Sequence, residues 1–173
     1  TISIIGCGMP KYSLGWNNTV TYKGFTLNAF FQGSFGADKL NFTRGLHLMG
    51  DRDARQATLA EIKERYIPGM NENAWLPAWS PTSKWETQST LFLENANYLR
   101  LKNLSVSYDF KVKKFADFRI SLSATNLFTI TKYKGIDPES SNVGGGTTDV
   151  QQGIDYGAYP NSKTYTLGLN ITF

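Results

Sequence analysis

The stretch Lys163-Thr164-Tyr165-Thr166-Leu167-Gly168-Leu169-Asn170-Ile171-Thr172-Phe173 decides the fold. Apolar or aromatic side chains occupy the odd positions from 165 to 173, and threonine, glycine and asparagine occupy the even positions. A period of two places these two kinds of side chain on opposite faces of a β-strand. About ten such residues can cross a bilayer as a tilted strand, whereas strands of water-soluble domains are commonly about five to six residues long. We therefore expect a membrane-spanning strand that ends at the membrane edge on Phe173.

The same alternation occurs four more times, over residues 13–22, 25–35, 103–110 and 118–128. Phe30 breaks the pattern of the second stretch, and Leu99 and Leu101 oppose the phase of the third. A β-bulge near residues 98–102, or emergence of the strand above the membrane, would resolve that conflict. The sequence thus predicts an all-β fold with about five long antiparallel strands.

The connections between these stretches alternate in length. Lys23-Gly24 is a two-residue turn, a long segment covers about 36–97, a short turn lies near 111–117, and another connection covers about 129–162. Outer-membrane barrels show this asymmetry, with short periplasmic turns and long extracellular loops. If Phe173 lies at the periplasmic rim, both short turns are periplasmic. The aromatic residues that we then expect in a girdle at this membrane interface are Tyr22, Phe25, Tyr108, Phe110, Phe118 and Phe173.

The composition favours a sheet with one apolar and one polar face. Aromatic residues make up 14% of the chain and charged residues only 18%, below the typical share of about 25%. The net charge of +4 is modest, and no basic run indicates a nucleic-acid partner. The remaining structural alternative is a soluble antiparallel sandwich, whose strands also alternate. Because the chain begins at Thr1 without an initiator Met, we expect its start to be internal to a longer precursor.

Several short motifs, weak singly but in a shared order, resemble the C-terminal barrel of SusC/RagA-type TonB-dependent transporters. They are Pro10-Lys11-Tyr12-Ser13-Leu14-Gly15, Tyr22-Lys23-Gly24-Phe25, the stretch 94–104, Asn126-Leu127-Phe128, Gly135-Ile136-Asp137-Pro138-Glu139, and Tyr159-Pro160 before the closing strand. The resemblance implies that residues 1–173 are the C-terminal part of a 22-stranded barrel with a plugged lumen. The family's TonB box, plug domain and earlier strands have no counterpart in this chain. Since open strand edges are not tolerated in lipid, the five strands must pair with further barrel strands.

The resemblance also implies a function and partners. It implies TonB-energised import of a nutrient oligomer, a glycan or a peptide, across the bacterial outer membrane, together with a SusD-like surface lipoprotein. The polar side chains would then face the lumen and contact the plug domain, while the opposite face meets lipid. These lumen-facing residues are Asn17, Asn28, Gln32, Asn103, Ser121 and Asn170.

The long segment 36–97 carries a predicted helix and three tryptophans. Residues 51–66 predict a short helix that Asp51 or Asp53 could cap and that Pro68-Gly69 would end. The tryptophans are Trp75, Trp79 and Trp85. Flat indole rings can stack on sugar faces, but they can equally pack against each other and the loop helix, so both interpretations stay open. The stacking interpretation supports the alternative function, a soluble β-sheet carbohydrate-binding module.

No cofactor or catalytic site is expected. Oxygen-rich loops can bind calcium, but Asp137, Glu139, Asp149 and Asp155 match no EF-hand spacing, so solvated loop charges are the default interpretation. Cys7 and His47 are the only residues of their types, they lie far apart in sequence, and no acidic residue stands at a recognisable spacing. We therefore predict no metal site and no enzyme.

Overall fold

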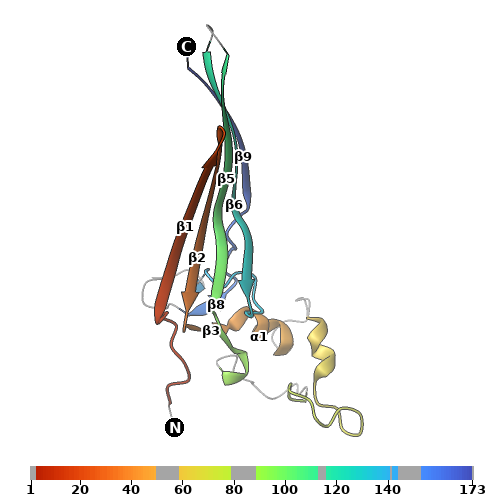
Figure 1. Cartoon of the computed structure of the whole chain (residues 1–173). Helices are drawn as coiled ribbons and strands as arrows, with labels where there is room; N and C mark the ends of the chain where they lie inside the picture. The colour runs from red at the N-terminus through yellow and green to blue at the C-terminus, as the bar shows by residue number, and fades with distance from the viewer. Residues whose placement is uncertain are drawn as a thin grey trace.

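The computed structural model describes residues 3–49, 59–78, 89–112, 116–140, 142–143 and 153–172, and five long strands dominate it (Figure 1). These strands are β1 (Tyr12–Tyr22), β2 (Phe25–Phe35), β5 (Tyr98–Val112), β6 (Ala116–Thr131) and β9 (Thr164–Thr172). All neighbours are antiparallel, and their order in the sheet is β1-β2-β5-β6-β9, so each long strand pairs with the next long strand in sequence. All five predicted strands are present, and β5 and β6 are longer than predicted.

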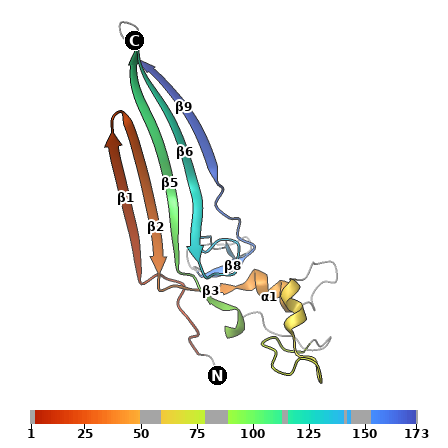
Figure 2. The same ribbon diagram turned by 45° about the vertical axis from the view of Figure 1, so that its right-hand side comes forward.

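Short and long connections lie at opposite ends of this sheet (Figure 2). Lys23 and Gly24, with φ of 47° and 86°, form the β1–β2 turn, as the twist of a two-residue hairpin requires. A Cβ on Gly24 would lie 2.7 Å from the carbonyl oxygen of Asp109, so glycine is needed there. Strand β5 ends and β6 begins at the same end, whereas residues 36–97 and 132–163 connect strands at the other end. We name these two long connections the loop layer.

Two adjacent rows across the sheet show the difference between its faces. Val20, Leu27, Val106, Leu122 and Leu167 pair in succession across all five strands. The next row is entirely polar, namely Thr19, Asn28, Ser105, Ser123 and Thr166. Because cross-strand partners point to the same side, one face of the sheet is apolar and the other polar.

A β-bulge at Lys102 resolves the conflict in phase that the sequence showed. Phe30 of β2 pairs with Asn103 of β5, and the next residue, Phe31, pairs with Leu101. Lys102 is therefore an extra residue in β5 that has no partner in β2. The extra residue returns Leu101 and Leu99 to the apolar face and leaves Arg100 on the polar face. Phe30 remains an exception, because it pairs with Asn17 and Asn103 on the polar face.

The loop layer contains its own small sheet and core (Figure 1). The sheet has the order β4-β3-β8-β7, from β3 (Asp38–Asn41), β4 (Leu93–Asn95), β7 (Asn142–Val143) and β8 (Ile154–Tyr156). Helix α1 (Phe42–Met49) follows β3, and two short 3-10 helices are η1 (Ala60–Glu64) and η2 (Thr90–Phe92). The buried core consists of Leu40, Leu48, Leu76 and Phe92. Among the described residues no helix is long and apolar enough to cross a membrane.

The loop layer contains one short helix inside the predicted range 51–66 and another, α1, before it. Residues 51–58 of the predicted helix lie outside the described ranges, and residues 60–64 form the 3-10 helix η1 without a side-chain cap. The helix that the sequence analysis missed, α1, begins after Asn41, whose Oδ1 accepts the backbone N–H of Arg44 at 2.9 Å. Its Gly45 leaves room for the ring of Phe92, since a Cβ there would lie 3.1 Å from that ring.

Candidate functional site

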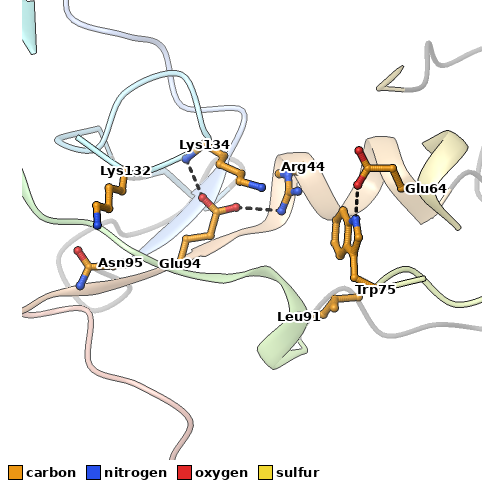
Figure 3. A pocket seen from close by; sticks show the side chains of 8 residues that line it. All are labelled: Arg44, Glu64, Trp75, Leu91, Glu94, Asn95, Lys132 and Lys134. Carbon is orange, nitrogen blue, oxygen red and sulfur yellow. Dashed lines mark hydrogen bonds and ion pairs between the residues drawn. The ribbon is translucent and has the colours of Figure 1, made fainter. Parts of the chain in front are cut away.

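A pocket of about 520 Å³ opens in the loop layer around Trp75 (Figure 3). Its walls come from separate elements: Arg44 from α1, Glu64 from the end of η1, and Glu94 from β4. Trp75, Leu91, Asn95, Lys132 and Lys134 complete the lining. Both long connections therefore contribute to the same pocket.

Trp75 is held at its N–H edge by Glu64, and Arg44 lies over its ring, while part of the residue stays exposed. Its indole Nε1 donates to Glu64 Oε2 at 2.5 Å, and the guanidinium carbon of Arg44 lies 4.9 Å from the ring centroid. The side chain keeps 37% of its accessible surface. Because its N–H already has an acceptor and Arg44 lies over the ring, the indole can offer a ligand only the part of its ring that stays exposed, and not its donor. Trp79 and Trp85 lie outside the described residues, so the choice between stacking and packing stays open for them.

Arg44 joins α1 to β4 and η1. It is 6% exposed, and its Nη1 contacts Glu94 Oε1 at 3.2 Å while its Nη2 pairs with Glu61. The other oxygen of Glu94 accepts the backbone N–H of Lys134 at 2.7 Å. Arg44 Nε is buried and has no partner within the described part of the chain. These contacts fix the floor of the pocket.

A second charged cluster, centred on Arg100, attaches the connection 132–163 to the sheet. Arg100 Nη2 contacts Asp137 Oδ1 at 2.5 Å, and Nη1 contacts Glu139 Oε2 at 2.6 Å. The side chains of Arg100 and Asp137 are each 4% exposed. Lys102 Nζ contacts both oxygens of Glu139 at 3.0 Å, so the bulge residue takes part.

Asp137 is ionised more readily than an ordinary aspartate. Burial raises the pKa of its carboxyl, but the backbone N–H groups of Asn161 and Glu139 and the guanidinium of Arg100 donate to it and outweigh that effect. The net result is a pKa below the usual value. Asp137 therefore remains an anion in its buried position.

Lys39 and Tyr133 connect the same loop to the small sheet. Lys39 Nζ donates to the carbonyl oxygens of Pro138 and Ser140, each at 2.5 Å, and burial lowers the pKa of its ammonium group. The hydroxyl of Tyr133 donates to Asp155 Oδ2 at 2.5 Å, and burial raises the pKa of that phenol.

The expectation of solvated acidic residues in this loop is wrong for Asp137 and Asp155, which are each 4% exposed. Both are bound by donors of the protein itself, and Asp149 lies outside the described residues. Within the described ranges no group of three His, Cys, Asp or Glu side chains could hold a metal ion. The sequence analysis did not single out Arg100. A signal was available, because a charged residue within a spanning strand usually faces the interior and has a partner.

The structure places the six predicted lumen residues together. The register puts Asn17, Asn28, Gln32, Asn103, Ser121 and Asn170 on the polar face. Asn28 Nδ2 donates to Thr19 Oγ1 of the neighbouring strand at 2.8 Å. Their contact with a plug domain stays a prediction.

Five of the six predicted girdle residues cluster at the end of the sheet with the short turns. Phe25 and Tyr108 have ring centroids 4.3 Å apart, and the rings of Phe110 and Phe118 stack at 5.2 Å with an interplanar angle of 8°. Tyr22 pairs with Phe25 at the same end, and Phe173 lies outside the described residues. Contact of this cluster with a membrane interface stays a prediction.

No protein-family model matches the chain. Known proteins nevertheless resemble it along nearly its whole length. TonB-dependent receptor P3 of Formosa agariphila is 34% identical over 177 aligned residues, which cover 98% of this chain and 17% of that protein. TonB-dependent receptor SusC of Bacteroides thetaiotaomicron is 32% identical over 109 residues, covering 60% of this chain and 10% of that protein.

Solved structures agree with these sequence relatives. The chain matches part of the RagAB peptide transporter with a TM-score of 0.79 and 29% identity, over 96% of this chain and 17% of that one. The closed-closed state of the RagAB peptide importer gives the same TM-score at 27% identity. The chain thus spans less than a fifth of the length of these proteins. The predicted antiparallel barrel segment with a short helix in its long loops is confirmed, and these relatives are receptors and transporters rather than enzymes.

Proposed function

Because the chain is similar over nearly its whole length to a TonB-dependent receptor, and over 60% of its length to SusC, we propose that it serves an outer-membrane transporter. It would form part of the barrel wall and of the extracellular loops of a protein that imports nutrient oligomers, either glycans or peptides. The barrel would be an integral protein of the bacterial outer membrane.

The observation that carries this proposal is the pair of adjacent rows across the sheet. The aliphatic row includes Val20, Leu122 and Leu167, which are 58%, 55% and 77% exposed. So large an apolar surface is rare on a monomeric soluble protein but is the normal lipid-facing surface of a membrane barrel. The neighbouring polar row suits a lumen that is wet or filled by a plug.

The partners follow from the edges of the sheet and from the relatives. In the described part of the chain, β1 and β9 are the edge strands, and their outer backbone groups need further barrel strands in lipid. We propose a plug domain against the polar face, TonB acting on that plug, and a SusD-like lipoprotein over the loop layer. Neither catalysis nor a cofactor in this chain is needed for this role.

The alternative function, a soluble carbohydrate-binding module, is not favoured. Its expected relatives are soluble lectin-like domains, whereas the relatives found are receptors and a peptide transporter. A soluble module with this structure would also expose the apolar face of its sheet to water.

Fractionation of cells that produce the receptor tests the proposal. We expect the protein in the outer-membrane fraction, extracted by detergent only, and we expect removal of residues 164–173 to prevent its accumulation there. Uptake of labelled oligopeptides and oligosaccharides should stop when the proton-motive force is collapsed. A monodisperse, cooperatively unfolding monomer in detergent-free buffer would contradict the proposal.

A further inference from the structure

We propose that the pocket around Trp75 binds a carboxylate-bearing ligand, whose anionic group lies at Lys134 and whose flat or apolar part lies against Trp75 and Leu91. This inference deepens the proposed function and rests on it, because it assigns a chemical class to a substrate that reaches the loop layer. Figure 3 shows Lys134 extending toward Arg44 and Trp75, whereas Lys132 lines the other end of the same pocket and points away from the indole.

The acidic side chains of the pocket are already neutralised or hydrogen-bonded by the protein. Glu94 accepts Arg44 at one oxygen and the backbone N–H of Lys134 at the other. Glu64 accepts the indole N–H of Trp75. Arg44 in turn is shared between Glu94 and Glu61. These carboxylates therefore have little capacity left to bind a cationic ligand.

The two lysines of the pocket, unlike its carboxylates, still have free hydrogen-bonding capacity. Lys132 and Lys134 are exposed, and within the described ranges neither ammonium group makes a hydrogen bond or an ion pair. The only recorded contact of an ammonium here is that of Lys134 Nζ with the ring of Trp75, at 5.9 Å from the centroid. A lysine ammonium has three donors, so Lys134 offers an anion three unused donors beside the indole, and Lys132 offers three more on the other side of Glu94.

The rest of the pocket suits the non-charged part of such a ligand. The exposed part of the Trp75 ring and the half-buried side chain of Leu91 supply an apolar wall. A volume of about 520 Å³ falls within the range of small-ligand sites. A ring or side chain that carries a carboxylate can therefore contact the indole and the Lys134 ammonium group together.

The carboxylate of such a ligand could belong to a uronic acid residue of an oligosaccharide or to an acidic side chain of a peptide. Binding should be measured by isothermal titration calorimetry on the complete detergent-folded receptor. The probes are tri-galacturonate with maltotriose as its neutral counterpart, and tri-glutamate with tri-glutamine as its neutral counterpart. We expect one of the two carboxylate probes to bind and its neutral counterpart to bind at least tenfold more weakly.

Substitutions of pocket residues test whether the probe binds in this pocket. Lys134→Gln should weaken binding of the carboxylate probe about tenfold, as loss of a charge-assisted hydrogen bond does, Trp75→Ala should weaken it as well, and Lys132→Gln should weaken it less. Lys63→Gln is the matched control, because Lys63 is an exposed lysine of η1 that does not line the pocket. It should leave the affinity unchanged.

Three outcomes would overturn the inference: no binding of either carboxylate probe, equal binding of the neutral probes, or a Lys134→Gln variant that binds like the native protein. Detergent-dependent folding and outer-membrane location are measured on the same preparations. If these persist while carboxylate binding fails, the pocket assignment fails and the proposed transporter function stands.

Discussion

Arg100 on the polar face of β5 and Asp137 in the connection 132–163 form a buried ion pair, with Nη2 and Oδ1 2.5 Å apart. The pair joins a strand of the barrel wall to a loop that begins beyond the end of β6. Glu139 and Lys102 extend it, so the β-bulge that keeps Leu99 and Leu101 on the apolar face also contributes a cation to the attachment. The loop layer is therefore fixed to the sheet through a buried charge on its polar face.

Replacing Arg100 with Ala should cost about 3–5 kcal/mol, because it leaves Asp137 buried without its cation. The measurement is the free energy of unfolding in urea of the receptor in detergent or lipid. Lys111→Ala is the control, since the Lys111–Asp117 pair is largely exposed, at 82% and 56%, and should contribute little. Equal costs for both variants would contradict the buried attachment.

Asp137 should make stability depend on pH in one direction. Its folded pKa lies below the unfolded value of about 3.9, so its stabilisation is complete above about pH 5 and is lost as the pH falls through the folded pKa. The difference in unfolding free energy between the native protein and Asp137→Asn should therefore shrink as the pH falls below about 4. A difference that stays constant down to about pH 2 would contradict this assignment.

The backbone of Asn126 has φ of 51°, in the left-handed region opposite the Lys102 bulge. Asn126→Val should cost about 1–3 kcal/mol, because a β-branched residue is strained in this conformation. Asn126→Gly should keep the backbone and lose only the hydrogen bond from Nδ2 to the carbonyl oxygen of Ser162. Urea unfolding of the two variants tests this order, and a less stable glycine variant would refute it.

The two faces of β9 should respond differently to charge. Leu167 pairs with Leu122 on the apolar face, and Thr166 pairs with Ser123 on the polar face. Leu167→Arg should destabilise the lipid-inserted protein by about 2–4 kcal/mol, and Thr166→Arg by less. Unfolding in liposomes gives both values, and a larger cost at Thr166 would reverse the assigned faces.

The sequence predicted the strands and faces well because a period of two persists over some ten residues in each strand. It also indicated a bulge near residues 98–102, where Leu99 and Leu101 broke the phase. Loop structure was harder to predict. The partners of Arg100 lie 37 and 39 residues away, in a segment without periodicity. Helix α1 has eight residues and an internal Gly45, so it depends on packing against Phe92 rather than on its own propensity.

The most direct test of the barrel-wall assignment is the oxygen accessibility of single spin labels placed from 164 to 172 in the lipid-inserted receptor, with Cys7 first replaced by Ser. We expect accessibility to alternate with a period of two, high at Tyr165, Leu167, Leu169 and Ile171 and low at the positions between them. Labels at Ile120 and Leu122 of β6 should match their partners Leu169 and Leu167. Accessibility without alternation, or with the opposite phase, would contradict the account.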